Sequence, residues 1–312
     1  MGQFVDKNIA IGIHVDSLTE SAQSPEGTLD PTYFSVLDRF LEIAERRKIP
    51  LTFFVIGKEL LQKEHAARIA LASAQGHEIA SHSWSHPVDL SYLPKDEIEQ
   101  EIKMSRDIIL ETTGISPKGF VGPGWATSKT IQESLIANSF SYDTSPFPSW
   151  VMMPQYLFWI AHFLFKPNFR RFLRRGFDVH QCLTLPKQPY ILRSSNGPGT
   201  LTMLPIPTTS MNIACWHSLG FALGWDAYFR IVKNSLANSK AFHYVMHIGD
   251  LVAPEDWKDN FSSSSMPRRD VPISEKILRF EQVLDIFEQA GREVVRMENL
   301  ANNVHPATRS IK

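Results

Sequence analysis

Three side chains have the types and the spacing of a divalent-metal site. His82 and His86 stand four residues apart in the stretch SHSWSHP, and Asp16 follows the apolar run IAIGIHV near the N-terminus. Two imidazoles and one carboxylate bind a metal while leaving positions open for water or substrate. Two histidines four residues apart also occur as ordinary surface residues, so this pair alone fits both interpretations.

Other polar residues that follow apolar runs favour the metal interpretation. His247 stands in YVMHIGD late in the chain, and FVGPGWA supplies a glycine-containing loop after another apolar run. Asp16 is in an equivalent place after the first run. Because catalytic loops of parallel sheets follow the carboxyl ends of the strands, we expect these segments to meet at one site.

The elements that must position these residues alternate between strand and helix. The hydrophobic spacing predicts strands at 9–15, 51–57 and 77–82 and helices at 31–48, 58–76 and 94–114. Later strands are predicted in KGFVGP, SFSYDTS, LTMLPI, FHYVMHI and REVVRM, with helices at about 127–138, 219–237 and 274–290. Repeated strand–helix units favour an α/β fold with a parallel sheet, open or closed into a barrel.

Composition limits the classes of protein to consider. With 312 residues, 43% of them hydrophobic, the chain can bury a sizeable core in one large domain or two small ones. The net charge of -1 excludes a globally basic nucleic-acid binder. Two cysteines, Cys182 and Cys215, form no disulfide framework, and Asp6 interrupts any N-terminal signal sequence. We therefore expect a cytoplasmic protein without a nucleic-acid partner, and its oligomeric state stays open.

The order of several motifs resembles the polysaccharide deacetylase family, also called the NodB-homology or carbohydrate esterase 4 family. These motifs are IHVDS, TFFVIG, GHEIASHSWSHP, GFVGPGWA, YDTSPFP and FHYVMHIGD, and the resemblance spans about residues 8–295. It implies one deacetylase-like domain over 1–312, folded as a distorted seven-stranded (β/α) barrel. It also implies a divalent metal, zinc above all, whose ligands are Asp16, His82 and His86.

The same resemblance suggests roles for residues around the metal. His247 matches the late histidine that acts as the general acid in the family. The metal and a backbone N–H hold the oxyanion of the tetrahedral intermediate in the family, and the resemblance places the segment of Tyr142 and Asp143 at that point, so we expect these residues to contact the substrate. Trp125, beside the site, could stack on a sugar ring, although tryptophans are as often core residues.

The chain departs from the family pattern at the catalytic base. Where many members have a D-x-D motif whose first Asp is the base, this chain has His14, two residues before Asp16 and on the same side of the strand. A neutral imidazole can accept a proton from water, so we expect His14 to serve as the base. Val121 stands where many members have an Arg that pairs with that Asp. Without the Asp, an Arg here would have no carboxylate to pair with, so the absence of both residues is consistent in charge. A weakly active metal site and an inactive binding relative remain as alternatives.

The composition of one segment, predicted to be an insertion between strands, indicates the kind of substrate. Residues 150–165 contain no charge, and residues 166–175 contain five basic side chains and no acid. The apolar run is too short to span a bilayer, which takes about 20 helical residues. We expect an amphipathic insertion over 146–190 that faces the membrane or the substrate, with Arg170 and Arg171 on a phosphate or on anionic headgroups. A helical cap with its apolar side buried is the alternative.

A subgroup of the family narrows the expected function. SHSWSHP, GPGWA and NGPGTLTMLPIPTT resemble deacylases of polyprenyl-phosphate-linked amino sugars. We therefore expect hydrolysis of an N-acetyl or N-formyl group on a sugar carried by undecaprenyl phosphate, in lipid A or envelope glycan modification. The partners would be this lipid-linked amino sugar and the inner-membrane surface, with the protein peripheral on its cytoplasmic side. A peptidoglycan or polysaccharide N-deacetylase and a non-catalytic metal- or sugar-binding relative are the alternatives.

Overall fold

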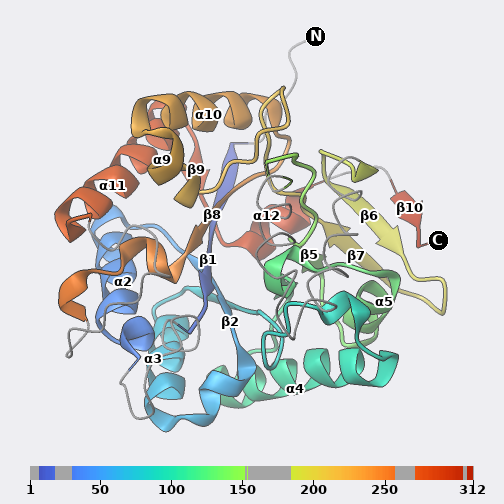
Figure 1. Cartoon of the computed structure of the whole chain (residues 1–312). Coiled ribbons are helices and arrows are strands. Elements are labelled where there is room, and N and C mark those ends of the chain that lie inside the picture. The colour runs from blue at the N-terminus through green and yellow to red at the C-terminus, as the bar shows by residue number, and fades with distance from the viewer. Residues whose placement is uncertain are drawn as a thin grey trace, which may run out of the picture.

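Strands and helices alternate along the chain and form one curled sheet surrounded by helices (Figure 1). The computed structural model describes residues 7–17, 30–151, 153, 184–256, 271–304 and 308–311. Its strands are β1 (Asn8–Val15), β2 (Thr52–Val55), β3 (Glu78–Ser81), β4 (Gly119–Phe120), β5 (Tyr142–Asp143), β6 (Tyr190–Arg193), β7 (Thr200–Met203), β8 (Phe242–His247), β9 (Glu293–Val294) and β10 (Thr308–Ser310). Among the described residues they make one sheet in the order β10-β6-β7-β5-β4-β3-β2-β1-β8, with β9 paired to β1.

The helices cover both sides of this sheet. They are α2 (Ser35–Arg47), α3 (Lys63–Ala74), α4 (Lys95–Thr113), α5 (Lys129–Ala137), α9 (Ser218–Leu223), α10 (Trp225–Asn238), α11 (Ile273–Gln289) and α12 (Met297–Asn303). Figure 1 shows most of them in an arc around the sheet, with α12 inside the arc. Because the strands are covered on both faces, they are rich in apolar residues throughout, as parallel sheets are.

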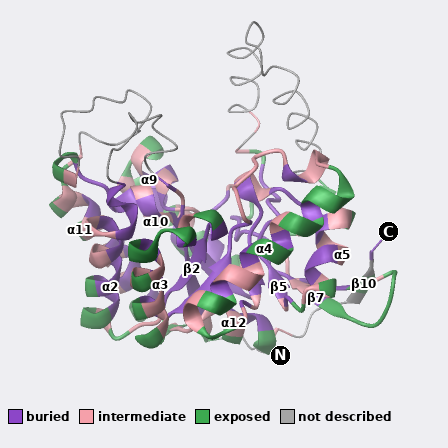
Figure 2. Ribbon diagram, turned by 90° about the horizontal axis from the view of Figure 1, so that it is seen from below, coloured by how far each residue is buried: buried purple, intermediate pink, exposed green. Residues whose placement is uncertain are grey.

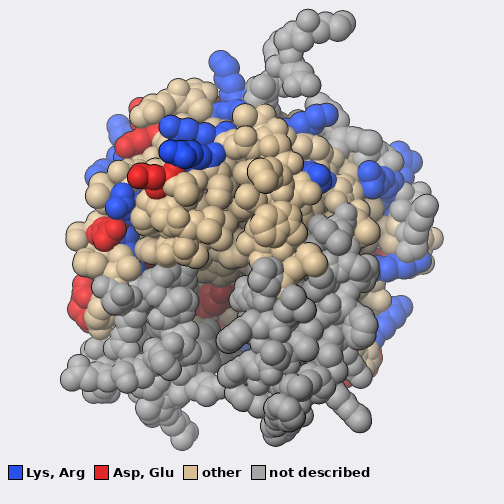
Figure 3. Space-filling view, turned by 45° about the horizontal axis from the view of Figure 1, so that its top comes forward, with Lys and Arg blue, Asp and Glu red and all other residues tan. Residues whose placement is uncertain are grey.

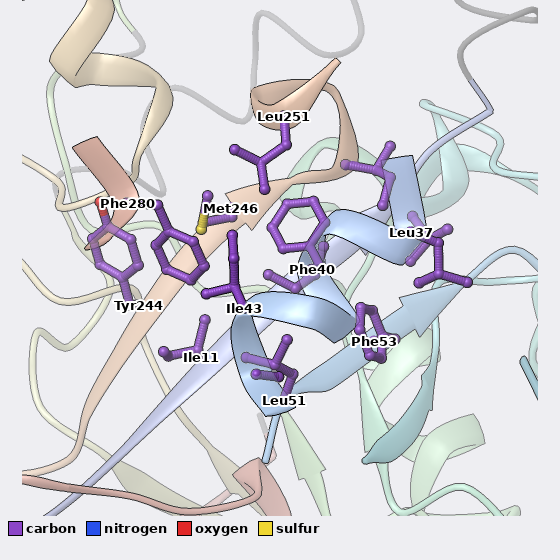
Figure 4. Packing of buried hydrophobic residues seen from close by; sticks show 14 of the residues in the cluster. Ile11, Leu37, Phe40, Ile43, Leu51, Phe53, Tyr244, Met246, Leu251 and Phe280 are labelled. Atoms are coloured by element: carbon purple, nitrogen blue, oxygen red, sulfur yellow. The ribbon is translucent and has the colours of Figure 1, made fainter. Parts of the chain in front are cut away.

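The largest hydrophobic cluster packs helices against the outer face of the sheet (Figure 4). Phe40 of α2 and Phe280 of α11 meet with ring centroids 6.1 Å apart. Ile11 of β1 and Tyr244 of β8 lie in the same cluster, fully buried. Each such side chain stabilises the fold by about 1.5–3 kcal/mol relative to an exposed one. The cluster therefore holds β1 and β8 firmly against the helices outside them.

The inner face of the sheet is packed closely around β1. Alternation along this strand sends Ala10, Gly12 and His14 to the inside. A Cβ added at Gly12 would lie 2.9 Å from the ring of Phe54 and 3.2 Å from Met297 of α12, so only glycine fits there. This packing leaves His14 as the last inward side chain of the strand, at the carboxyl end.

The expected α/β class and the strand–helix units are confirmed, whereas the expected count of seven strands differs from the ten described. The additional strands include β6, which is antiparallel to β7, and β10, which pairs with β6. No helix separates β6 from β7, so the strand–helix pattern gives no sign of β6. Within the described residues the sheet is not closed, because β8 and β10 form its two ends.

Most of the expected insertion, 154–183, lies outside the described residues, and so do Arg170 and Arg171. Across the helices that are described, none combines the length and apolar character needed to cross a membrane. Figure 2 shows buried residues gathered on the strands and on the helix sides that face them. On the face in Figure 3, lysine and arginine side chains are scattered around a largely uncharged centre, in keeping with the near-zero net charge.

Candidate metal centre

The register of the sheet brings the ends of β1 and β3 to the same level. Val15 of β1 pairs with Val55 of β2, which in turn pairs with Ser81 of β3. Asp16 and His82 are therefore each one residue beyond the last paired position. The sequence places a carboxylate and an imidazole at these points, and the parallel strands present both at the same edge of the sheet.

The three expected ligands converge at this edge. Nε2 of His82 lies 3.3 Å from Oδ1 of Asp16, and Nε2 of His86 lies 3.5 Å from the same oxygen. One candidate ligand atom from each residue falls within 4.8 Å of the other two. Oδ1 of Asp16 is buried and has no hydrogen bond to any described residue. A buried acceptor facing two imidazole nitrogens fits a divalent cation, and the set of donors suits zinc.

The tautomer of His82 is fixed by the neighbouring strand. Its Nδ1 lies 2.7 Å from the carbonyl oxygen of Val121, which can only accept a hydrogen bond. Nδ1 therefore carries a proton that points at Val121, and Nε2 is the ring atom that faces Asp16. Metal-binding histidines commonly donate their other N–H in this way, which orients the ring.

The ionisation states suit both metal binding and base catalysis. Burial alone would raise the pKa of Asp16. The adjacent imidazoles of His82 and His86 lower it by more than burial raises it, so the pKa of Asp16 falls well below its usual range. Burial, together with the nearby His247 and His82, lowers the pKa of His14 well below its usual value. Asp16 is thus a carboxylate and His14 a neutral imidazole at neutral pH.

The two expected catalytic histidines lie together beside the ligands. The ring of His14 has its centroid 5.0 Å from that of His82 and 4.9 Å from that of His247. A ring nitrogen of His247 accepts the backbone N–H of Asp250, and the Asp250 carboxylate accepts the N–H of His247 at 2.9 Å. In the neutral ring the proton of His247 is then on the other nitrogen, and the ring is held in place.

An aromatic group borders the histidines. Trp125 closes the 3-10 turn η4 (Pro123–Trp125), and its ring centroid is 6.1 Å from His14 and 5.9 Å from His247. Phe147 and Trp216 pack against it, at 4.7 and 5.8 Å. Phe147 belongs to the motif YDTSPFP and follows a predicted strand, but neither it nor Trp216 was identified as a site residue from the sequence. The group offers flat apolar surface of the kind on which sugar rings stack.

The structure does not bring the side chains of Tyr142 and Asp143 to the metal centre. The Tyr142 hydroxyl is fully buried and donates to Glu78 at 2.7 Å, and the Tyr142 backbone N–H donates to the carbonyl of Lys118. Asp143 projects from the opposite face of β5 and accepts the N–H of Ser145 at 2.7 Å. Burial raises the pKa of Asp143 to about 7. The two side chains therefore make hydrogen bonds in the interior of the fold, and a contact of this segment with the substrate stays a prediction.

Sequence comparisons connect this arrangement to carbohydrate deacetylases. A family model described as Polysaccharide deacetylase matches residues 25–143. A peptidoglycan deacetylase of Helicobacter pylori is 26% identical over 145 residues, which are 44% of this chain and 48% of that protein. A chitooligosaccharide deacetylase of Rhizobium leguminosarum is 33% identical over 72 residues, 23% of this chain and 32% of that protein. The chain thus spans about half or less of the length of these curated relatives.

A solved structure shares the fold. A protein of Mycobacterium smegmatis, assigned to the polysaccharide deacetylases, superposes with a TM-score of 0.60 over 97% of this chain and 92% of its own. At 19% identity, this likeness concerns the fold alone. The family model and the names of the relatives thus show that the part of the chain around residues 25–143 is similar to polysaccharide deacetylases.

Proposed function

We propose that this protein hydrolyses the N-acetyl or N-formyl group of an amino sugar with the help of a divalent metal, zinc in the first place. The observation that carries the proposal is the convergence of Asp16, His82 and His86 on one point, with His14 and His247 beside it. The relatives named as peptidoglycan and chitooligosaccharide deacetylases support the reaction type.

The roles of the residues follow from their protonation and placement. A divalent ion held by Asp16, His82 and His86 would polarise the amide carbonyl and make water acidic enough to attack at neutral pH. His14, kept neutral by burial, accepts the proton of the attacking water. His247 lies on the other side of His14 and donates the proton that the departing amine needs. Trp125 forms a flat wall on which the sugar ring stacks.

The same proposal assigns the substrate to the polyprenyl-phosphate-linked amino sugars. The apolar and basic segments between 150 and 175 support this choice, with Arg170 and Arg171 meeting the phosphate. The described residues next to this segment add exposed apolar surface: Trp150 is 42% and Met211 71% exposed, and the Trp150 indole N–H donates to the Met211 carbonyl. In this proposal the insertion faces the inner membrane and the protein is peripheral there.

The decisive experiment offers the purified, zinc-loaded protein three substrates: undecaprenyl-phosphate N-acetylhexosamine, its N-formyl analogue and a chitooligosaccharide. Mass spectrometry should detect loss of one acyl mass from a lipid-linked sugar, and chelator or His82→Ala should abolish this loss. Turnover of the chitooligosaccharide alone would keep the deacetylase and refute the lipid-linked substrate.

The non-catalytic alternative makes the opposite prediction at His14. If His14 is the base, His14→Ala lowers turnover and the wild-type protein is active with metal bound. If the protein only binds metal or sugar, the wild type leaves every substrate unchanged, and His14→Asp, which restores the carboxylate of the D-x-D motif, creates activity. Retained metal in both variants, measured by elemental analysis, keeps the comparison valid.

A further inference from the structure

A carboxylate from a neighbouring helix holds the backbone between the two histidine ligands. Glu101 of α4 accepts the N–H groups of Trp84 and Ser85 on Oε2, at 3.0 and 2.9 Å. Its Oε1 accepts the hydroxyl of Ser85 at 2.5 Å. Three donors of the loop from His82 to His86 thus converge on one side chain, which leaves little freedom to the middle of the loop.

The loop needs such support because its backbone is strained. Ser83 and His86 have φ angles of 65° and 57°, in the left-handed region that residues with a Cβ rarely adopt. The turn lets the chain double back, so that His86 Nε2 arrives 3.5 Å from Asp16. A hydrogen bond from the His86 N–H to the Ser83 hydroxyl, 3.1 Å long, lies within the loop itself. A relaxed loop would move His86 away from the carboxylate.

The other side of the loop is held by the 3-10 turn η2 (Gly57–Leu61). The N–H groups of Gly57 and Lys58 donate to the carbonyls of Ser83 and Trp84, at 3.0 and 2.8 Å. A Cβ at Gly57 would lie 2.9 Å from the Trp84 ring, so the two segments are in close contact. On this side the N–H of His82 donates to the carbonyl of Val55 at 2.8 Å, whereas the N–H groups of Trp84 and Ser85 on the α4 side go to Glu101. The carboxylate is therefore the acceptor that completes the loop's hydrogen bonding.

We propose that Glu101 is a positioning residue of the metal centre: its carboxylate fixes the strained loop that presents His86 alongside His82. This inference rests on the proposed function, because it assigns the loop to metal binding. A glutamine at the same place keeps one oxygen for the two backbone N–H groups, but its amide nitrogen replaces the oxygen that accepts the Ser85 hydroxyl, and the negative charge is lost. Residues that orient metal ligands typically change affinity by about 10–100-fold when they are replaced.

The test is a titration of the metal-free protein with Co²⁺, followed by its visible absorption, which reports ligand number and geometry. The full chain is compared with Glu101→Gln and with the matched control Glu97→Gln, an exposed position one turn earlier on α4. We expect Glu97→Gln to bind like the wild type. Glu101→Gln should bind about tenfold or more weakly, with an altered spectrum. Circular dichroism at the same temperature verifies that each protein is folded.

The outcomes separate this inference from the proposed function. A wild-type protein that binds no Co²⁺ would overturn the metal centre, and the role of Glu101 with it. A Glu101→Gln variant with unchanged affinity and spectrum would overturn the role of Glu101 and leave the centre intact. If Glu101→Gln does not fold, Ser85→Ala decides: losing one of the three hydrogen bonds should weaken Co²⁺ binding a few-fold, and an unchanged affinity would refute the inference.

Discussion

The amino and carboxyl ends of the parallel strands each bury a carboxyl group, but only the group at the amino end has its hydrogen bonds satisfied. At the amino end, Glu78 accepts hydrogen bonds from the Tyr142 hydroxyl at 2.7 Å, the Thr52 hydroxyl at 2.9 Å and the Glu298 N–H at 3.0 Å. At the carboxyl end, Oδ1 of Asp16 has no hydrogen bond within the described chain and faces two imidazole nitrogens. A satisfied buried group stabilises a fold, whereas an unsatisfied one at the end of several strands indicates a binding site.

The pKa values differ in the same way. Burial raises the pKa of Glu78, although the Glu298 N–H and the Tyr142 hydroxyl partly oppose it. The pKa of Asp16 ends up lowered in spite of its burial, because two imidazoles face it. One end therefore tolerates a neutral carboxyl group, and the other favours a charged one.

Asp16→Asn should have the largest effect, because it removes the charge at the carboxyl end while keeping the shape. We expect metal binding to fall by more than about 100-fold, since residues that merely support ligands already change affinity 10–100-fold. Turnover should fall with it. Elemental analysis after dialysis and competition with a chelator measure the first effect. Unchanged metal content would show that the three side chains do not form the centre.

Glu78→Ala, at the amino end of the strands, should lower the stability of the protein without affecting the metal centre. The change leaves three buried donors without an acceptor, so we expect the free energy of unfolding to fall by about 3 kcal/mol. Tyr142→Phe removes only one hydrogen bond and should cost about 1 kcal/mol. Urea unfolding of both variants gives these values. If Tyr142→Phe instead lowered kcat/KM tenfold without changing stability, Tyr142 would be a substrate-binding residue after all.

The contrast between the two ends also explains what the sequence could and could not predict. Asp16, His82 and His247 were predictable because each follows an apolar run, and the ends of parallel strands meet. The direction of Tyr142 was not predictable. Its ring occupies the space that a side chain at Gly119 would fill, where an added Cβ would lie 2.0 Å from the ring. Such a fit depends on a neighbouring strand, which the local pattern does not contain.

Glu101 illustrates the same limit at the carboxyl end. In the sequence it is one of several acidic residues in IEQEIK, a segment of ordinary amphipathic helix. Its hydrogen bonds go to a loop 16 and 17 residues earlier, and only the packing of α4 beside that loop reveals them. Similarly, the antiparallel pairing of β6 with β7 follows no strand–helix unit. The hydrophobic periodicity predicted most helices and strands. Residues that support the site, such as Glu101, are recognised only from tertiary contacts.

A third buried titratable group is His243, the second residue of β8. Both of its ring nitrogens are buried without a hydrogen bond to any described residue, and burial lowers its pKa from 6.5 to about 3. Between these values the unfolded chain binds a proton that the folded chain does not, so stability falls as the pH falls through this window. The loss attributable to His243 should be about 2 kcal/mol at pH 5.

The measurement compares urea unfolding of the wild type and His243→Leu at pH 7.5 and pH 5. Other histidines titrate in both proteins, so their contributions cancel in the difference between the two pH dependences. We expect the wild type to lose about 2 kcal/mol more than the variant on acidification. Equal losses would mean that His243 has a polar partner in the folded protein and is not comparable with Asp16.

Trp125→Leu should have the smallest effect, at the rim of the carboxyl end. Aromatic stacking contributes about 0.5–1.5 kcal/mol, so KM should rise roughly 3–10-fold, while metal affinity stays unchanged. Trp125→Phe, which keeps a ring, should recover part of the loss. Steady-state kinetics and a Co²⁺ titration measure the two quantities. A variant that loses metal affinity instead would assign the indole to holding His14 and His247 in place, because its ring lies about 6 Å from both.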